Sequence, residues 1–487
     1  MFDQAFAVYA SCPHLLNLNE HGDDTLRAAP SAFQTMANAH ASRAKAAVLA
    51  TLPVTCNLSS VPLLRKAEAT LAALAAEHPL IYGGRLQVDG IDGQPDLLER
   101  SPDGRYLPGL LLSGLSAEAG LSRPARVRLA LADRALLACG HGNGTGDAFI
   151  IMADGSRVTV VLQPSDFDTL AKDSPERREI DAILKGDAKT RPALGASCQQ
   201  CDWKAACKAE VQALDDLTRI AELGRSKRDV LIDAIPTVEA MARIRVEDYL
   251  RDKKRTIFPG IGPASLAKFK ERAACLVDPS AAPYLKRPLT LPNTPSTIFF
   301  DLETDPFAAN YVYLHGFVEQ TASGREFRPV LTPTVSPVAE RNAFAEAWQY
   351  VVTRVLNGHA CVIYYSPFEK TTYLELARRY PEVASVEMIE AFFDHPHVID
   401  LYTDWVRPHS VWPCSDLSIK TLAKFVGFSW RDTDPSGANS IVWFHDWVEN
   451  GNASAMERVL FYNEDDNIAV AEVVSAMQRM PVRATAN

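Results

Sequence analysis

Two acidic residues, separated by one leucine, follow a strongly apolar segment, Ile298–Phe300. Residues two apart on a strand face the same way, so Asp301 and Glu303 are expected to project together from the end of a buried strand. Two carboxylates beside an apolar core are costly unless a cation neutralises them. The pair therefore predicts a divalent-metal site, and the alternative is a set of solvated acids at the end of a strand.

The segment Asp301–Thr304, placed after a hydrophobic strand, resembles the first motif of the DnaQ-like (DEDD) 3′–5′ exonucleases, which have an RNase H-like fold. Phe368-Glu369 occupies the place of the family's Phe-Asp, and the longer Glu keeps the charge. Tyr462 and Asp466 lie at i and i+4 on one predicted helix face and match the Tyr-x-x-x-Asp form of the third motif.

This resemblance implies how the residues act. Asp301 would bridge two Mg²⁺ or Mn²⁺ ions, and Tyr462 would orient the attacking water. Asp465 is the neighbouring alternative to Asp466, and Asp400, at the end of a short predicted strand, is a supporting residue. The residues implied for metal binding are Asp301, Glu303, Glu369 and Asp466. Segments 418–423 and 436–443 also resemble the relatives, without a role that the residues reveal.

A second set of metal-binding residue types lies near residue 200. Cys198, Cys201 and Cys207 are close in sequence, and Cys12 stands far upstream. Three closely spaced thiolates can face one centre and a fourth can complete it, and both zinc and iron–sulfur clusters accept four cysteines. The one-plus-three spacing favours a 4Fe–4S cluster over zinc. The alternative is four unrelated buried cysteines.

The segment Tyr9–Leu16, taken with this cysteine spacing, is similar to the iron–sulfur nucleases of the RecB-like superfamily. That group includes the CRISPR-adaptation exonucleases and RecB-like nucleases with a C-terminal RNase H-like domain. The resemblance covers roughly residues 1–215. It implies that a 4Fe–4S cluster joins the two ends of the nuclease domain, held by Cys12, Cys198, Cys201 and Cys207.

The metal site expected for that nuclease domain is incomplete. His40 and Asp96 match the family's early His and first acid, and Arg128 stands near the expected Gln. Leu110 and Leu112 stand where an acid and a Lys are needed. Leucines cannot ligate a metal or orient water, so we expect this domain to be inactive and to hold substrate or a partner.

The segment Arg255–Arg272 resembles a helix–hairpin–helix, which contacts a nucleic-acid backbone. Gly260 and Gly262 allow close approach of the chain, and the next helix would direct backbone N–H groups at a phosphate. Lys268 and Lys270 supply positive charge there. A packing turn between helices is the alternative.

Composition and charge limit the class of protein to which these residues belong. The 487 residues are 47% hydrophobic and 23% charged, as in globular proteins, and the net charge is −10. This balance excludes a generally basic coat for nucleic acid, so any such contact must be local. The N-terminus lacks the basic and apolar regions of a secretory signal, and no apolar run reaches the ~18–20 residues of a membrane helix. We therefore expect a cytoplasmic protein that is not in a membrane.

The order of elements predicts an α/β fold class in three parts. Residues 1–215 would form a degenerate restriction-endonuclease-like (RecB-like) domain with strands at Leu80–Val88 and Tyr106–Leu112 and a hairpin around Asp154-Gly155. Residues 216–290 would form the helical hairpin region, ending in a Pro-rich linker, and residues 291–487 the RNase H-like DEDD domain.

Together these patterns predict a metal-dependent 3′–5′ exonuclease acting on single-stranded DNA, or on RNA. The sequence does not place the 2′-hydroxyl contacts that distinguish the two polymers. The iron–sulfur domain would hold the substrate or a partner such as a helicase or another repair protein. The alternative is a non-catalytic protein that binds nucleic acid or serves as the scaffold of a complex.

Overall fold

The computed structural model describes residues 2–88, 91–112, 121–171 and 173–483. The chain forms two compact units, the first of Met1–Pro192 with Ser197–Ala206 and the second of Ala193–Ala196 with Cys207–Asn487. Both units mix helices with strands, which confirms the α/β prediction. The helical region and the C-terminal sheet belong to the second unit, and domain boundaries at 215 and 290 stay a prediction.

The first unit is built on a six-stranded mixed sheet in the order β1-β2-β5-β6-β7-β8, with β3 and β4 as a separate pair. Its strands are β1 (Cys56–Asn57), β2 (Leu80–Tyr82), β3 (Leu86–Val88), β4 (Ile91–Gly93), β5 (Leu97–Arg100), β6 (Tyr106–Leu111), β7 (Asp147–Ile151) and β8 (Arg157–Val161). Its helices are α1 (Phe2–Ser11), α2 (Pro13–His21), α3 (Ala32–Thr51), α4 (Leu63–Ala75), α5 (Arg123–Ala138), α6 (Pro164–Asp168) and α7 (Pro175–Leu184).

Two glycines mark where the strands of this unit turn. The prediction of one strand over Leu80–Val88 is wrong, because Gly83 takes a φ of +73° after β2 and the chain enters β3 in another sheet. Gly155 takes a φ of +80° between the antiparallel strands β7 and β8, which confirms the predicted hairpin. Each of these two turns therefore contains a glycine with a positive φ.

Helix α8 (Lys204–Ala213) begins at the end of the first unit and continues into the second. The helical region of the second unit then contains α9 (Arg225–Leu231), α10 (Val238–Arg243) and α11 (Pro263–Val277). Leu231, Met241, Leu266 and Phe269 are buried together in its core. The region thus has an apolar core of its own.

The rest of the second unit is a five-stranded mixed sheet in the order β12-β11-β10-β13-β14. Its strands are β10 (Ser296–Asp305), β11 (Tyr311–Thr321), β12 (Gly324–Leu331), β13 (Ala360–Tyr364) and β14 (Val398–Asp400); β9 (Tyr284–Leu285) pairs with β15 (Ser410–Val411) outside it. The helices are α12 (Pro337–Leu356), α13 (Phe368–Arg379), α14 (Val386–Phe393), α15 (Arg407–His409), α16 (Ile419–Phe425), α17 (Gly437–Asn450) and α18 (Ala453–Arg479).

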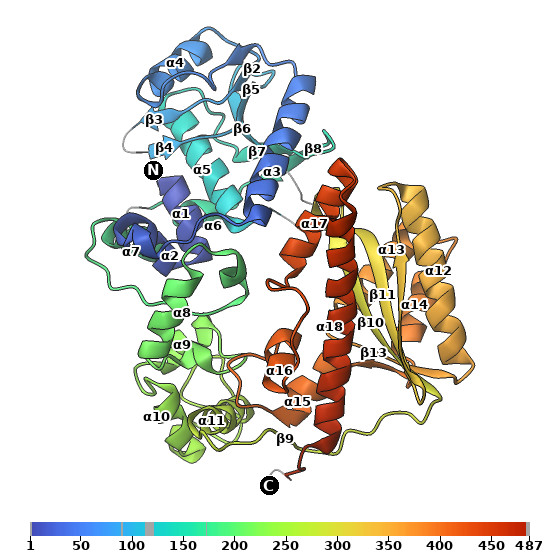
Figure 1. Ribbon diagram of the computed structural model, residues 1–487. Helices are drawn as coiled ribbons and strands as arrows, with labels where there is room; N and C mark the ends of the chain where they lie inside the picture. Colours follow the sequence, from blue (N-terminus) through green and yellow to red (C-terminus); the bar gives the residue numbers. More distant parts are fainter. Residues whose placement is uncertain (1, 89–90, 113–120, 172, 484–487) are drawn as a thin grey trace. The chain divides into compact units, whose positions relative to one another are not determined.

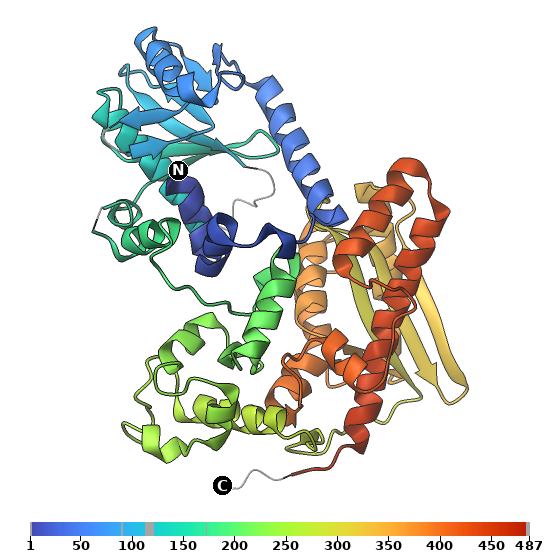
Figure 2. The ribbon, with the colours of Figure 1, turned by 60° about the vertical axis from the view of Figure 1, so that its left-hand side comes forward.

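The central strand β10 is apolar on both faces because helices cover both (Figure 1). Ile298 and Phe300 pack into the core formed with α12 and α13, whereas Phe299 packs into the core formed with α18. Helix α18 runs along the sheet in both views (Figures 1 and 2) and contacts β10 and β11. The C-terminal half of β10 therefore presents alternate side chains to α18.

Candidate active site

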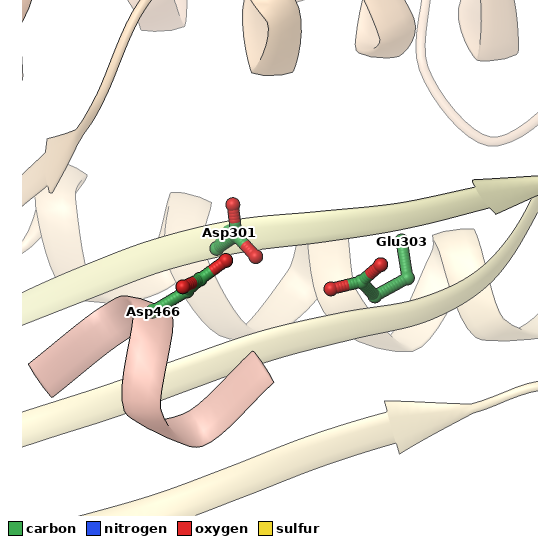
Figure 3. Close-up of side chains that lie close together, drawn as sticks. All are labelled: Asp301, Glu303 and Asp466. Carbon is green, nitrogen blue, oxygen red and sulfur yellow. The ribbon is translucent and has the colours of Figure 1, made fainter. Parts of the chain in front are cut away.

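Three carboxylates gather between β10 and α18. One ligand oxygen from each of Asp301, Glu303 and Asp466 lies within 4.8 Å of those of the other two (Figure 3). Asp301 and Glu303 share a face of β10 because they are two residues apart, and Asp466 comes from the middle of α18. We call these three residues the acid group. The structure thus brings together two predicted motifs separated by more than 150 residues.

The three carboxylates of the acid group are buried close together, so ionising all of them without a cation is unfavourable. Burial and the carboxylates of Asp466 and Glu303 raise the pKa of Asp301 well above its ordinary range. Burial and the charge of Asp466 raise the pKa of Glu303 to about 8, and burial raises the pKa of Asp466 itself. A divalent cation would remove this repulsion, and carboxylate oxygens are ligands that Mg²⁺ and Mn²⁺ prefer.

Glu369 approaches the acid group from the first turn of α13. Its side chain is buried, and its charge is one of the causes that raise the pKa of Asp301. Its Oε2 atom has no hydrogen-bond partner in the described part of the chain. Burial raises the pKa of Glu369 well above its usual value, and Asp400 adds to this effect. An unpartnered buried carboxylate oxygen fits a metal ligand.

Asp400 supports the turn that presents Glu369. One oxygen of Asp400 accepts hydrogen bonds from the backbone N–H groups of Ser366, at 3.1 Å, and Thr403, at 2.9 Å. Ser366 has a φ of +98°, an unusual conformation for a residue with a Cβ, between β13 and α13. Asp400 therefore fixes the end of β13 relative to β14, and a short π-helix, Leu401–Val406, follows it.

The third motif lies on one face of α18. Tyr462 is one turn before Asp466 and shares a hydrogen bond with it, while Trp430 Nε1 donates to Asp466 Oδ1 at 2.7 Å. Asp465 faces another way, because the backbone N and Nε of Arg431 each donate to it at 2.8 Å. Of the two adjacent acids that the sequence offered, Asp466 is the one beside Asp301.

Lys420, from α16, is a cation beside the site for which sequence reasoning gave no role. Its Nζ donates to the hydroxyl of Tyr462 at 2.9 Å and to the carbonyl oxygen of Pro435 at 3.0 Å. Its charge also opposes the effect of burial, because it acts to lower the pKa of each member of the acid group. The only signal in the sequence was that residues 418–423 resemble the relatives.

Asn463 and Gly316 were also missed. Asn463 Nδ2 donates to Asp301 Oδ2 at 2.8 Å, and Gly316 lies opposite Asp301 on β11. A Cβ on Gly316 would lie 1.5 Å from Asn463 Oδ1, so glycine leaves the space that the Asn463 amide occupies. A glycine inside the apolar strand 311–321 was the available signal, because such glycines often mark a close approach.

The acid predicted for the first unit is already neutralised. Asp96 accepts from the backbone N–H of Leu111 and from Nη2 of Arg128, both at 2.9 Å, and Lys45 Nζ lies 3.9 Å away. Leu110 is buried in the core, Leu112 is half-buried, and His40 lies on α3. The two cations balance the charge of Asp96, so this acid does not require a metal ion.

The structure does not support the predicted 4Fe–4S cluster. Cys12 caps α2, Cys198 lies in a short 3₁₀ turn, Cys201 follows that turn and Cys207 lies on α8. Burial raises the pKa of Cys201, and the thiols of Cys198 and Cys12 add to it. These thiols are neighbours, yet within the described ranges only the acid group brings three ligand atoms within 4.8 Å of one another. The cluster therefore has no support from the arrangement of these cysteines.

The predicted helix–hairpin–helix is only partly as expected. Gly260 has a φ of +73° and Gly262 caps α11, as a tight turn before a helix requires. Lys268, however, forms an ion pair with Glu222, which also pairs with Arg272 and Arg407. Lys268 thus has a carboxylate partner within the protein, and its contact with a phosphate stays a prediction. Lys270 is half-exposed on the same helix, and its role stays a prediction.

A comparison with protein families decides the type of the C-terminal domain. Residues 298–478 match the RNase H superfamily. The match runs from β10 to α18, so it includes the acid group and Glu369, and it confirms the RNase H-like part of the resemblance. A domain of this type indicates a nuclease that binds nucleic acid and whose acids could bind divalent metal. A comparison with curated proteins found no match.

The RecB-like resemblance of the first unit stays a prediction.

Among the helices of the described residues, none has both the length and the apolar character that crossing a bilayer requires.

Proposed function

We propose that this protein is a metal-dependent 3′–5′ exonuclease that hydrolyses single-stranded DNA in its RNase H-like domain. The observation that carries the proposal is the acid group, whose three ligand oxygens lie within 4.8 Å of one another. Its donors are all carboxylate oxygens, and their mutual repulsion favours a cation between them. The unpartnered Oε2 of Glu369 supplies a fourth donor of the same kind.

Each side chain has a distinct task in this proposal. Asp301 would bridge two metal ions, and Glu303, Glu369 and Asp466 would complete their ligands. Divalent ions held in this way activate a water molecule and stabilise the leaving oxygen. The Tyr462 hydroxyl positions the attacking water, as in the DEDDy type. Lys420 holds that hydroxyl and offers a positive charge to the scissile phosphate.

The first unit would act as a scaffold for substrate or for a partner such as a helicase. This part rests on Asp96, whose charge Arg128 and Lys45 already balance. The same observation favours a second candidate function, in which the whole chain binds nucleic acid or assembles a complex without cleaving. If the first unit is a RecB-like domain, Leu110 and Leu112 would be an example of such decay in this protein.

The test is a degradation time course on 5′-labelled single-stranded DNA and RNA with Mg²⁺ or Mn²⁺. We expect a ladder that shortens from the 3′ end and an Asp301→Asn variant slower by roughly 10²–10³-fold, the scale of losing one group that stabilises transition-state charge. Glu457→Gln is the matched control, because Glu457 is an exposed acid on the helix that carries Asp466.

The outcomes separate the candidate functions. Cleavage of DNA that depends on Asp301 and not on Glu457 supports the exonuclease. Binding without cleavage supports the scaffold. Cleavage that survives Asp301→Asn would place the active site outside the acid group.

A further inference from the structure

Residues 427–436, which we call the strap, connect α16 to α17 and lie against the acid-bearing face of α18. Trp430 is the buried residue of the strap, with 8% of its surface exposed. Its indole ring packs edge-on against Phe428, with ring centroids 4.9 Å apart. Its Nε1 donates to Oδ1 of Asp466 at 2.7 Å, a short distance for an N–H···O bond.

The strap is fixed to α18 by the two residues that follow Trp430. Arg431 bonds Asp465 through its backbone N and its Nε, and its Nη2 reaches Glu464. Asp432 pairs with Arg458 at 2.8 Å, about two turns earlier on the helix than Asp466. The residues next to Trp430 thus hold the strap in register with the helix that carries Asp466, so the indole has a defined place.

An indole N–H suits a carboxylate that must be held in one orientation and must stay ionised to bind a metal ion. An indole N–H only donates and carries no charge, so it can hold one carboxylate oxygen without replacing the cation that the acid group needs. Donation to the ionised form also favours that form, and this bond lowers the pKa of Asp466 against the effect of burial.

We propose that Trp430 is a positioning residue for the metal site. By donating to Oδ1 of Asp466, it fixes the plane of a carboxylate that lies beside Asp301 and Glu303. The proposal rests on the function proposed above, because it assumes that the acid group binds divalent metal. Partners that orient a metal ligand commonly contribute to metal affinity as well as to activity.

The test compares Trp430→Phe, which keeps an aromatic ring and loses the donor, with Trp447→Phe, the same change on α17. Mn²⁺ binding by calorimetry and the Mn²⁺ dependence of cleavage are both measured. We expect Trp430→Phe to weaken Mn²⁺ binding by about 10–100-fold, the usual effect of losing such a partner. Its maximal rate at saturating Mn²⁺ should recover to near the wild-type value, and Trp447→Phe should match the wild type.

A second variant separates the donor from the packing. Trp430→His keeps a ring N–H on a smaller side chain and should bind Mn²⁺ more tightly than Trp430→Phe. Equal loss in both variants would overturn the proposal, as would an unchanged Mn²⁺ affinity in Trp430→Phe. A wild-type protein that binds no Mn²⁺ would overturn the proposed function itself, and the inference with it, whereas Mn²⁺ binding without cleavage would leave the role of Trp430 intact.

Discussion

Replacing Glu303 by glutamine should stabilise the metal-free protein at alkaline pH. The carboxyl of Glu303 is buried, and its pKa rises from the ordinary 4.5 to about 8. Between these values the unfolded chain releases a proton that the folded chain retains, so stability falls as the pH rises through this window. Each tenfold change in proton affinity is worth about 1.4 kcal/mol, so the cost at pH 8 is on the order of 4 kcal/mol.

The Glu303→Gln variant has nearly the same shape and does not ionise. Without metal, its free energy of unfolding at pH 8 should exceed that of the wild type by on the order of 4 kcal/mol, and the gain should fall below about 1 kcal/mol at pH 5. Added Mg²⁺ should stabilise the wild type more than the variant, because the ion neutralises the carboxylate.

Urea unfolding in EDTA, followed by tryptophan fluorescence at pH 5 and pH 8, measures this difference. Glu457→Gln, at an exposed position on the same helix as Asp466, is the control and should change little. An equal free energy of unfolding for wild type and Glu303→Gln at pH 8 would refute the reasoning. So would a gain of the same size at both pH values, because that gain would not come from ionisation.

Three further perturbations test other parts of the site. Lys420→Met should slow cleavage by roughly 10²-fold. It should also move the acidic limb of the pH–rate profile to higher pH, because the acid group loses a nearby cation that lowers its pKa values. Lys420→Arg keeps the charge and should slow cleavage less. Gly316→Ala should destabilise by about 1–3 kcal/mol in urea unfolding, because its Cβ would meet Asn463, whereas Gly437→Ala, which has open space, should stay within about 0.5 kcal/mol. Asp96→Asn should leave the rate and Mg²⁺ dependence of cleavage unchanged, and cleavage lost with Asp96 would show that the first unit takes part.

The acid group was predictable because its signals are local. The apolar run before Asp301 defines a buried strand, and the two-residue repeat places Glu303 on the same face. The spacing of Tyr462 and Asp466 likewise defines one face of a helix. Choosing Asp466 over Asp465 needed the structure, because Arg431 lies 34 residues earlier in the chain.

The residues that sequence reasoning missed or misplaced depend on distant partners. Trp430 and Lys420 reach the site only because α16 and the strap fold back on α18. The ion pair of Lys268 with Glu222 was also missed, because Glu222 lies in a segment with no recognisable motif. Spacing along the chain does not reveal such pairings, since charged side chains can find partners in any segment that the fold brings near.

The ion pair between Asp96 and Arg128 has a consequence for how the two units respond to their surroundings. An arginine side chain is a counter-ion tethered to the chain, and its local concentration does not depend on the medium. The first unit should therefore unfold at the same denaturant concentration whether or not divalent ions are present, while the acid group of the second unit makes its stability follow their supply. A cell depleted of magnesium would then keep one half of this protein as stable as before and weaken the other.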